Sequence, residues 1–152
     1  MRRSSHSNSL TSIIASMAIS LLAAGAPMAD SGIPRSGRPD DARVYFITPT
    51  AGETVTSPVV VRFGLYEMGV APAGVVKVGT GHHHLIVDAE LPPPDLPIPA
   101  TDHYRHFGKG QTEVSLELTP GEHTLQLLLA DHIHVPHDPP VVSARITITV
   151  KK

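Results

Sequence analysis

The fold class of this chain is decided by residues 112–130, which read TEVSLELTPGEHTLQLLLA. Apolar side chains alternate with polar ones on both sides of Pro120-Gly121; they are Val114, Leu116 and Leu118 before it and Leu125, Leu127 and Leu129 after it. Because successive side chains of a β-strand point to opposite faces, this alternation predicts two half-buried strands, and Pro-Gly predicts the tight turn between them. The stretch therefore predicts an antiparallel pair, residues 112–118 and 123–130.

Similar short runs recur along the rest of the chain. They predict strands at residues 43–48, 58–65, 82–88 and 143–150, with residues 101–107 as a further strand that crosses the domain. The proline-rich connection 91–99 lacks backbone donors and is expected to be an exposed loop. Short strands with frequent turns indicate an all-β fold, specifically an immunoglobulin-like antiparallel β-sandwich of about seven strands.

The N-terminal residues are typical of a secretory signal peptide. Arg2 and Arg3 precede an apolar run over residues 10–26, and small residues follow up to Ala29. The run is too short and too often interrupted for a spanning helix. We therefore expect a signal-peptide helix at 1–29, a flexible leader at 30–42 and the β-sandwich domain at 43–152. The mature protein is expected in the periplasm or secreted, with no stable membrane insertion after cleavage.

The composition excludes several classes of function. The chain has no cysteine, which removes disulfides, thiolate metal ligands and cysteine nucleophiles. The formal net charge is −2 and no block of Lys or Arg follows Arg3, so nucleic acid is excluded as a partner.

The distribution of histidine points to a metal ion as the partner. Nine of the ten histidines lie after residue 81, most of them in three tracts within 82–84, 103–106 and 132–137. Neutral imidazole is the commonest metal ligand. If consecutive strands run antiparallel and residues 101–107 cross the domain, all three tracts meet at one end and His123 lies at the other.

Candidate ligands follow from strand and loop geometry. Within a strand, His82 and His84 point to one face and His83 to the other, while Pro136 fixes the loop that carries the last tract. We expect the metal ligands to be His84, His106, His134 and His137, with His82 in reserve. Two carboxylates beside the last tract, Asp131 and Asp138, are expected to accept the free ring N–H of a ligand.

Soft sulfur ligands are nearly absent, since there is no Cys and Met68 is the only methionine after the predicted cleavage at Ala29. This favours Cu(II) or Zn(II) as the bound ion. We expect a non-enzymatic protein that buffers or delivers this ion. Two alternatives stay open: an envelope interaction module with structural histidines and another envelope protein as its partner, and a copper-dependent redox enzyme such as a superoxide dismutase. No hydrolase motif is present in the sequence.

Four stretches together resemble an exported bacterial family of unknown function, DUF4399. They are GHHHL at 81–85, HFGKGQTE at 106–113, PGEHTLQL at 120–127 and DHIHVPHDPPV at 131–141. The resemblance implies a compact periplasmic β domain and supplies no activity. Some members are labelled rod shape-determining protein, but the polytopic membrane architecture of such a factor is not predicted by this sequence.

Overall fold

The structure is a computed structural model that describes residues 32–152, so the predicted signal peptide lies outside the described residues. The described part is all-β, and it contains no helix long and apolar enough to cross a membrane. Its strands are β1 (Arg43–Thr48), β2 (Thr54–Thr56), β3 (Val59–Tyr66), β4 (Gly69–Val70), β5 (Thr80–Val87), β6 (Tyr104–His106), β7 (Glu113–Leu116), β8 (Gly121–Ala130), β9 (Pro136–Val142) and β10 (Ile146–Lys151).

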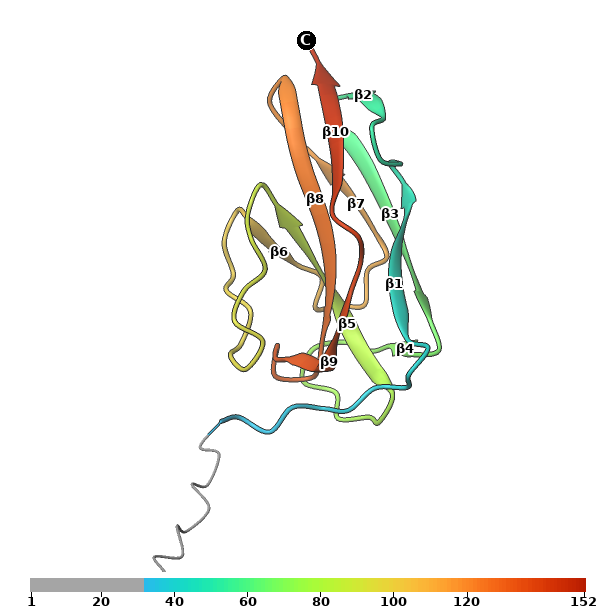
Figure 1. The fold of residues 1–152 in the computed structure, drawn as a ribbon, viewed down its shortest axis with the longest axis vertical. Coiled ribbons are helices and arrows are strands. Elements are labelled where there is room, and N and C mark those ends of the chain that lie inside the picture. The colour runs from blue at the N-terminus through green and yellow to red at the C-terminus, as the bar shows by residue number, and fades with distance from the viewer. Residues whose placement is uncertain (1–31) are drawn as a thin grey trace, which may run out of the picture. The chain divides into compact units, whose positions relative to one another are not determined.

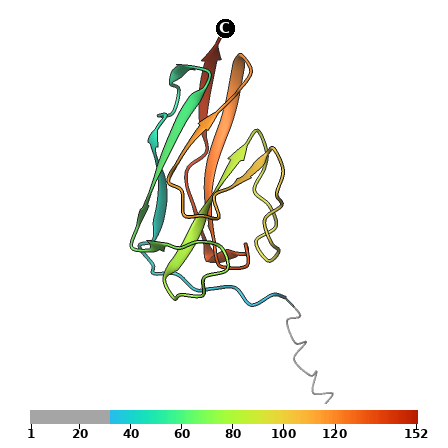
Figure 2. The same ribbon diagram turned by 180° about the vertical axis from the view of Figure 1, so that it is seen from behind.

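The strands form two sheets, which Figures 1 and 2 show from opposite sides. The smaller sheet has the order β1-β3-β7 and is antiparallel. The larger has the order β2-β10-β8-β5-β4, with β6 also paired to β5 and β9 also paired to β8. β2 and β4 are the parallel members. The predicted β-sandwich is confirmed.

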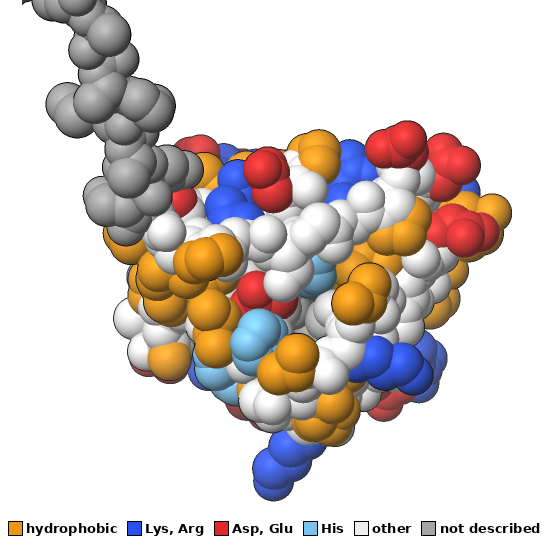
Figure 3. Space-filling model, turned by 90° about the horizontal axis from the view of Figure 1, so that it is seen from below, with side chains coloured by type: hydrophobic (Ala, Val, Ile, Leu, Met, Phe, Trp, Pro, Cys, Tyr) orange, Lys and Arg blue, Asp and Glu red, His pale blue; other side chains and the backbone are white. Residues whose placement is uncertain are grey.

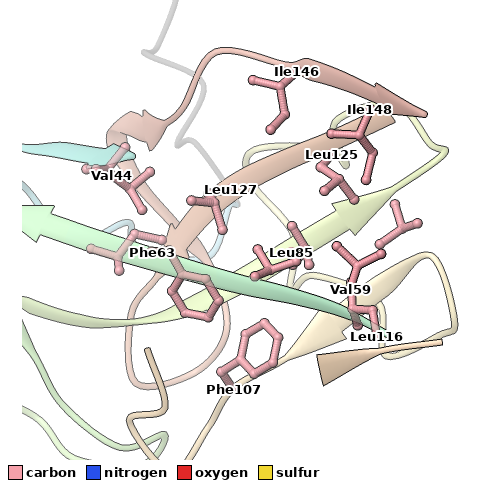
Figure 4. Packing of buried hydrophobic residues seen from close by; sticks show 14 of the residues in the cluster. Val44, Val59, Phe63, Leu85, Phe107, Leu116, Leu125, Leu127, Ile146 and Ile148 are labelled. Atoms are coloured by element: carbon pink, nitrogen blue, oxygen red, sulfur yellow. The ribbon is translucent and has the colours of Figure 1, made fainter. Parts of the chain in front are cut away.

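The main core lies between the sheets, as Figure 4 shows. Val61 and Phe63 of β3 are at most 1% exposed, as are Leu85 of β5 and Leu127 of β8. Each fully buried side chain of this size contributes about 1.5–3 kcal/mol relative to an exposed one. The burial predicted for Leu125, Leu127 and Leu129 is confirmed. The same alternation buries Val59 with Val61 and Phe63 on β3, and Ile146, Ile148 and Val150 on β10.

The opposite face of the larger sheet carries a second, smaller apolar cluster. Ile86 of β5 and Leu128 and Ala130 of β8 pack there with Ile98. Ile98 belongs to the proline-rich connection, which forms no strand between residues 88 and 103, as predicted. This connection therefore covers part of the sheet's outer face, where the histidines also lie.

β9 was not predicted because its prolines suggested a loop. β9 pairs with β8 only at its two ends, at Pro136 and at Val141–Val142. Pro139 and Pro140 lie between these ends, where no backbone N–H is required for pairing with β8, so the strand tolerates them. Residues assigned to a flexible leader are attached to this strand, since Arg35 Nε donates to the Pro136 carbonyl oxygen at 3.1 Å and Gly37 bridges to Asp138.

Candidate metal centre

Four imidazoles from three separate segments gather on the outer face of the larger sheet. They belong to His82 and His84 of β5, His106 of β6 and His134 of the loop between β8 and β9. Their ring centroids lie 4.6–6.0 Å apart in every pairing. Nitrogens of His82, His84 and His106 lie within 4.8 Å of one another. The three tracts therefore converge, as strand direction predicted, and we call these four residues the histidine cluster.

Strand pairing fixes three of the four rings. His82 and His84 lie two residues apart on β5, so both side chains leave the same face of the sheet. His84 is directly opposite His106 in the antiparallel β5–β6 ladder, and their rings stack with centroids 5.0 Å apart at 22°. The short strand β6 thus places His106 next to the β5 pair.

The fourth ring depends on a pre-formed loop, residues 131–135. The Asp131 carboxylate, 2% exposed, accepts the amides of Ile133 and Val135 at 3.0 and 3.1 Å and the Ser36 hydroxyl at 2.9 Å. The His134 amide donates to the Asp131 carbonyl oxygen at 3.0 Å, and the His134 backbone has φ 70°. These bonds hold His134 in a conformation that a β-strand would not give it.

The buried imidazoles of the histidine cluster lack ordinary hydrogen-bond partners. His82 and His84 are at most 1% exposed. Within residues 32–152, both ring nitrogens of His82 and Nδ1 of His84 make no hydrogen bond. Buried polar atoms are nearly always paired, and an unpaired one costs about 1–3 kcal/mol. His106 is exposed and His134 half-buried, so the cluster has a buried floor and an accessible mouth.

The environment keeps these rings in the form that binds metal ions. Burial, together with repulsion from His106 and His134, lowers the pKa of His82 to about 4. Burial and the neighbouring imidazoles lower the pKa of His84 to about 2, and burial also lowers the pKa of His106. The imidazoles of His82, His84 and His106 are therefore neutral near pH 7, with lone pairs available for a cation.

His137, another predicted ligand, lies apart from the cluster. Its Nε2 is 3.2 Å from the Thr80 carbonyl oxygen, and its ring packs against Gly81 on the inner face. Pro136 does not bring the His137 ring to the His134 ring. Pro136 begins strand β9, whereas His134 lies in the preceding loop with a positive φ of 70°.

The two predicted carboxylates have other partners. Asp138 is exposed and pairs with Arg35 Nη1 at 3.0 Å. Asp131 makes no hydrogen bond to a cluster imidazole among the described residues, since its oxygens bind the loop and Ser36. Its charge is nevertheless near enough to oppose the lowering of the His82 pKa. Asp131 therefore shapes the loop and supplies a nearby negative charge.

The remaining predictions about single histidines concern His83 and His123. His83 faces the core, with its ring centroid 4.7 Å from that of Phe63, as alternation required. His123 lies outside the cluster and pairs with Asp88, Nδ1 to Oδ2 at 2.6 Å. Both placements agree with the sequence-based expectation.

Gly108 is a contributor that sequence reasoning did not connect to the histidines. A Cβ at this position would collide with Cε1 and Nε2 of His106. The backbone of Gly108 thus leaves the space in which the His106 ring lies. The signal in the sequence is a glycine two residues after a candidate ligand, which is also an ordinary turn signal.

Comparison with known families agrees with the sequence resemblance. A family model described as "Domain of unknown function (DUF4399)" matches residues 61–151, a range that contains the whole histidine cluster. No curated protein and no solved structure matches the chain.

Proposed function

The chain belongs to the DUF4399 family, whose description assigns no function, and we propose from its geometry that it binds one divalent transition-metal ion in the histidine cluster. The proposed ion is Cu(II) or Zn(II), and the proposed role is to buffer or deliver it in the periplasm. One observation supports this most strongly: four imidazoles from three segments converge, and the most buried of them, His82, has no hydrogen-bond partner among the described residues.

The dimensions of the cluster suit an ion. Four nitrogens at about 2.1 Å from a tetrahedral ion lie about 3.4 Å from one another. The nitrogens of His82, His84 and His106 lie within 4.8 Å of one another before any ion is added, so small ring rotations would close them on the ion. An all-imidazole set without thiolate suits Cu(II) and Zn(II).

The accessible mouth favours exchange of the ion over permanent storage. His82 and His84 form the floor, whereas His106 is exposed. Four rings would complete a tetrahedral coordination shell, and the exposed His106 is the ligand that solvent or an acceptor could displace. The Asp131 carboxylate is occupied by loop hydrogen bonds and offers no free base for catalysis, which supports binding and transfer as the role.

The test is a metal titration of tag-free protein with two matched variants, His134→Ala and His137→Ala. We expect one Cu(II) or Zn(II) per wild-type chain by calorimetry and competition with a chelator. His134→Ala should weaken binding on the order of 100-fold, because a ligand is lost from a pre-formed site. His137→Ala, three residues away but outside the cluster, should leave the affinity unchanged. Absence of stoichiometric binding, or equal losses in the two variants, would overturn the proposal.

A further inference from the structure

The loop between β4 and β5, residues 71–79, exposes three valines and is called the valine loop here. Val75 is 46% exposed, Val76 78% and Val78 99%. Single exposed apolar residues are normal in soluble proteins, but neighbouring ones on one projecting segment mark interaction surfaces. The exposure of Val78 is nearly complete, so its side chain projects from the domain and contributes little to the fold.

The backbone of the valine loop is held in this exposed conformation. The Val75 amide donates to the Pro72 carbonyl oxygen at 3.1 Å, and the Thr80 hydroxyl donates to the Lys77 carbonyl oxygen at 2.8 Å. Gly74 takes a positive φ of 83° within the loop. A loop fixed in this way presents its valines to solvent without a further ordering cost.

The valine loop is joined to both segments that form the mouth of the histidine cluster. The Ala73 amide donates to the Gly108 carbonyl oxygen, and the Gly74 amide donates to the His132 carbonyl oxygen, both at 2.9 Å. Ile133, 41% exposed, extends the apolar surface from the second segment. Figure 3 shows this end of the domain, where apolar side chains and an acidic side chain lie near exposed histidines.

The charged side chains of the valine loop and of the segment that follows His106 are lysines. Lys77 lies between the exposed valines, and Lys109 follows the glycine that contacts Ala73. Residues 68–87 and 103–112 contain no Asp or Glu. The neighbouring carboxylates are occupied: Asp131 is 2% exposed and binds its own loop and Ser36, and Asp138 pairs with Arg35. An apolar tip with flanking lysines therefore complements an anionic lipid surface, in which phosphates pair with Lys and acyl chains accept the apolar side chains.

We propose that the valine loop docks this domain peripherally on an anionic lipid bilayer. Val76 and Val78 enter the headgroup region, and Lys77 and Lys109 contact lipid phosphates. The projecting shape favours a bilayer, which adapts to a convex tip, over a protein partner, which would need a matching pocket. This inference does not depend on the metal site; if both hold, the mouth of the histidine cluster lies near the membrane surface.

The absence of tryptophan from the chain makes a direct test possible. Val78→Trp places a single tryptophan at the tip, which is excited selectively over the three tyrosines of the chain. The apoprotein is mixed with phosphatidylglycerol–phosphatidylcholine vesicles or with pure phosphatidylcholine vesicles. We expect a blue shift and co-sedimentation with the anionic vesicles, and binding about tenfold weaker to the neutral ones.

Three further variants test the proposal without a fluorophore. In co-sedimentation, Val76→Asp combined with Val78→Asp should weaken binding to anionic vesicles at least about tenfold, and Lys77→Glu should weaken it less. Ile47→Asp is the matched control, because Ile47 is 56% exposed on β1 of the other sheet, and its binding should equal that of the wild type. Circular dichroism checks that each variant is folded.

Two results would overturn the proposal. One is failure of the wild-type chain to bind anionic vesicles. The other is an equal loss of binding in Ile47→Asp and in the double valine variant. A third outcome separates lipid from protein. If the wild-type chain does not bind vesicles but crosslinks to an envelope protein, and the double valine variant does not form that crosslink, the loop is a protein-docking surface and the lipid assignment is wrong.

Discussion

The histidine cluster and the His123–Asp88 pair show two environments for the same side chain. Both ring nitrogens of His123 have partners, Asp88 Oδ2 at 2.6 Å and the Thr119 carbonyl oxygen at 2.8 Å. Burial alone would lower the pKa of His123, but its hydrogen bond to Asp88 raises it above the usual value. His82 has no such partners and its pKa is lowered to about 4.

The comparison separates His123, whose hydrogen bonds stabilise the fold, from His82, whose burial without partners does not. At His123 the chain supplies an acceptor for each N–H, so the imidazole contributes to the fold. At His82 it supplies none among the described residues, and at His84 it leaves Nδ1 unpaired. The core-facing His83 is unpaired as well, but only at the cluster are several imidazoles held together at this energetic cost. A bound cation would recover that cost, which is why the comparison leads to the metal proposal.

The largest expected effect is a loss of apoprotein stability in acid. Burial lowers the pKa of both His82 and His83 to about 4. Because these values lie below the unfolded value of 6.5, the unfolded chain binds more protons below pH 6.5. Stability present above that pH is therefore lost as the pH falls toward 4, by roughly 3 kcal/mol for each of the two residues. Urea unfolding at pH 7 and pH 4, with a chelator present, measures it.

His83→Leu sharpens this prediction, since His83 faces the core and lies outside the cluster. It should remove about a third or less of the acid sensitivity, because the pKa values of His82 and His84 stay lowered, and it should leave metal affinity unchanged.

His123 acts in the opposite direction. Its raised pKa stabilises the fold below pH 6.5, and that contribution disappears as the pH rises through the raised value. A free energy of unfolding that is equal at pH 7 and pH 4 would contradict the assignment of buried neutral imidazoles.

The next effect is a gain in stability together with a loss of metal binding, both expected from a substitution at His84. His84→Leu replaces an imidazole whose Nδ1 is unpaired, opposite Leu128 and beside the apolar outer cluster. We expect the metal-free variant to be more stable than wild type by about 1–3 kcal/mol at pH 7.5, and to lose metal binding. His123→Leu, the matched change at the paired site, should destabilise by about 1 kcal/mol. Destabilisation of the same size in both variants would remove the distinction between the two regions.

The smallest effect tests the packing behind His106. In Gly108→Ala, the added Cβ should displace the His106 ring and weaken Zn(II) binding about tenfold, which is the effect typical of residues that orient a ligand. Gly37→Ala is the control, because no heavy atom lies within 4 Å of a Cβ built there. Competition with a chromophoric chelator measures the Zn(II) affinity of both variants. Equal affinities in Gly108→Ala and Gly37→Ala would show that Gly108 does not position the His106 ring for metal binding.

Much of the site could be predicted because strand periodicity is a local property. Alternation alone separates His83 from His82 and His84, and antiparallel order alone brings β6 beside β5. The structure confirms both, with Phe63 against His83 and His106 against His84. The convergence of the tracts therefore follows from patterns that can be read along the chain.

The remaining features depend on contacts between residues far apart in sequence. Whether His134 or His137 reaches the cluster is decided by Asp131, whose carboxylate is fixed by Ser36, 95 residues away. Pairing of the proline-containing strand β9 depends on its register with β8, and the parallel strands β2 and β4 are too short to carry a pattern of their own. Local propensity gives no signal for such choices.

Anomalous diffraction from crystals of the tag-free protein loaded with Cu(II) or Zn(II) tests the central claim most directly. We expect one anomalous peak per chain, about 2.0–2.1 Å from a ring nitrogen of each of His82, His84, His106 and His134. A peak at His123, at His137 or at no defined position, with the rings of His82 and His84 unmoved, would contradict it.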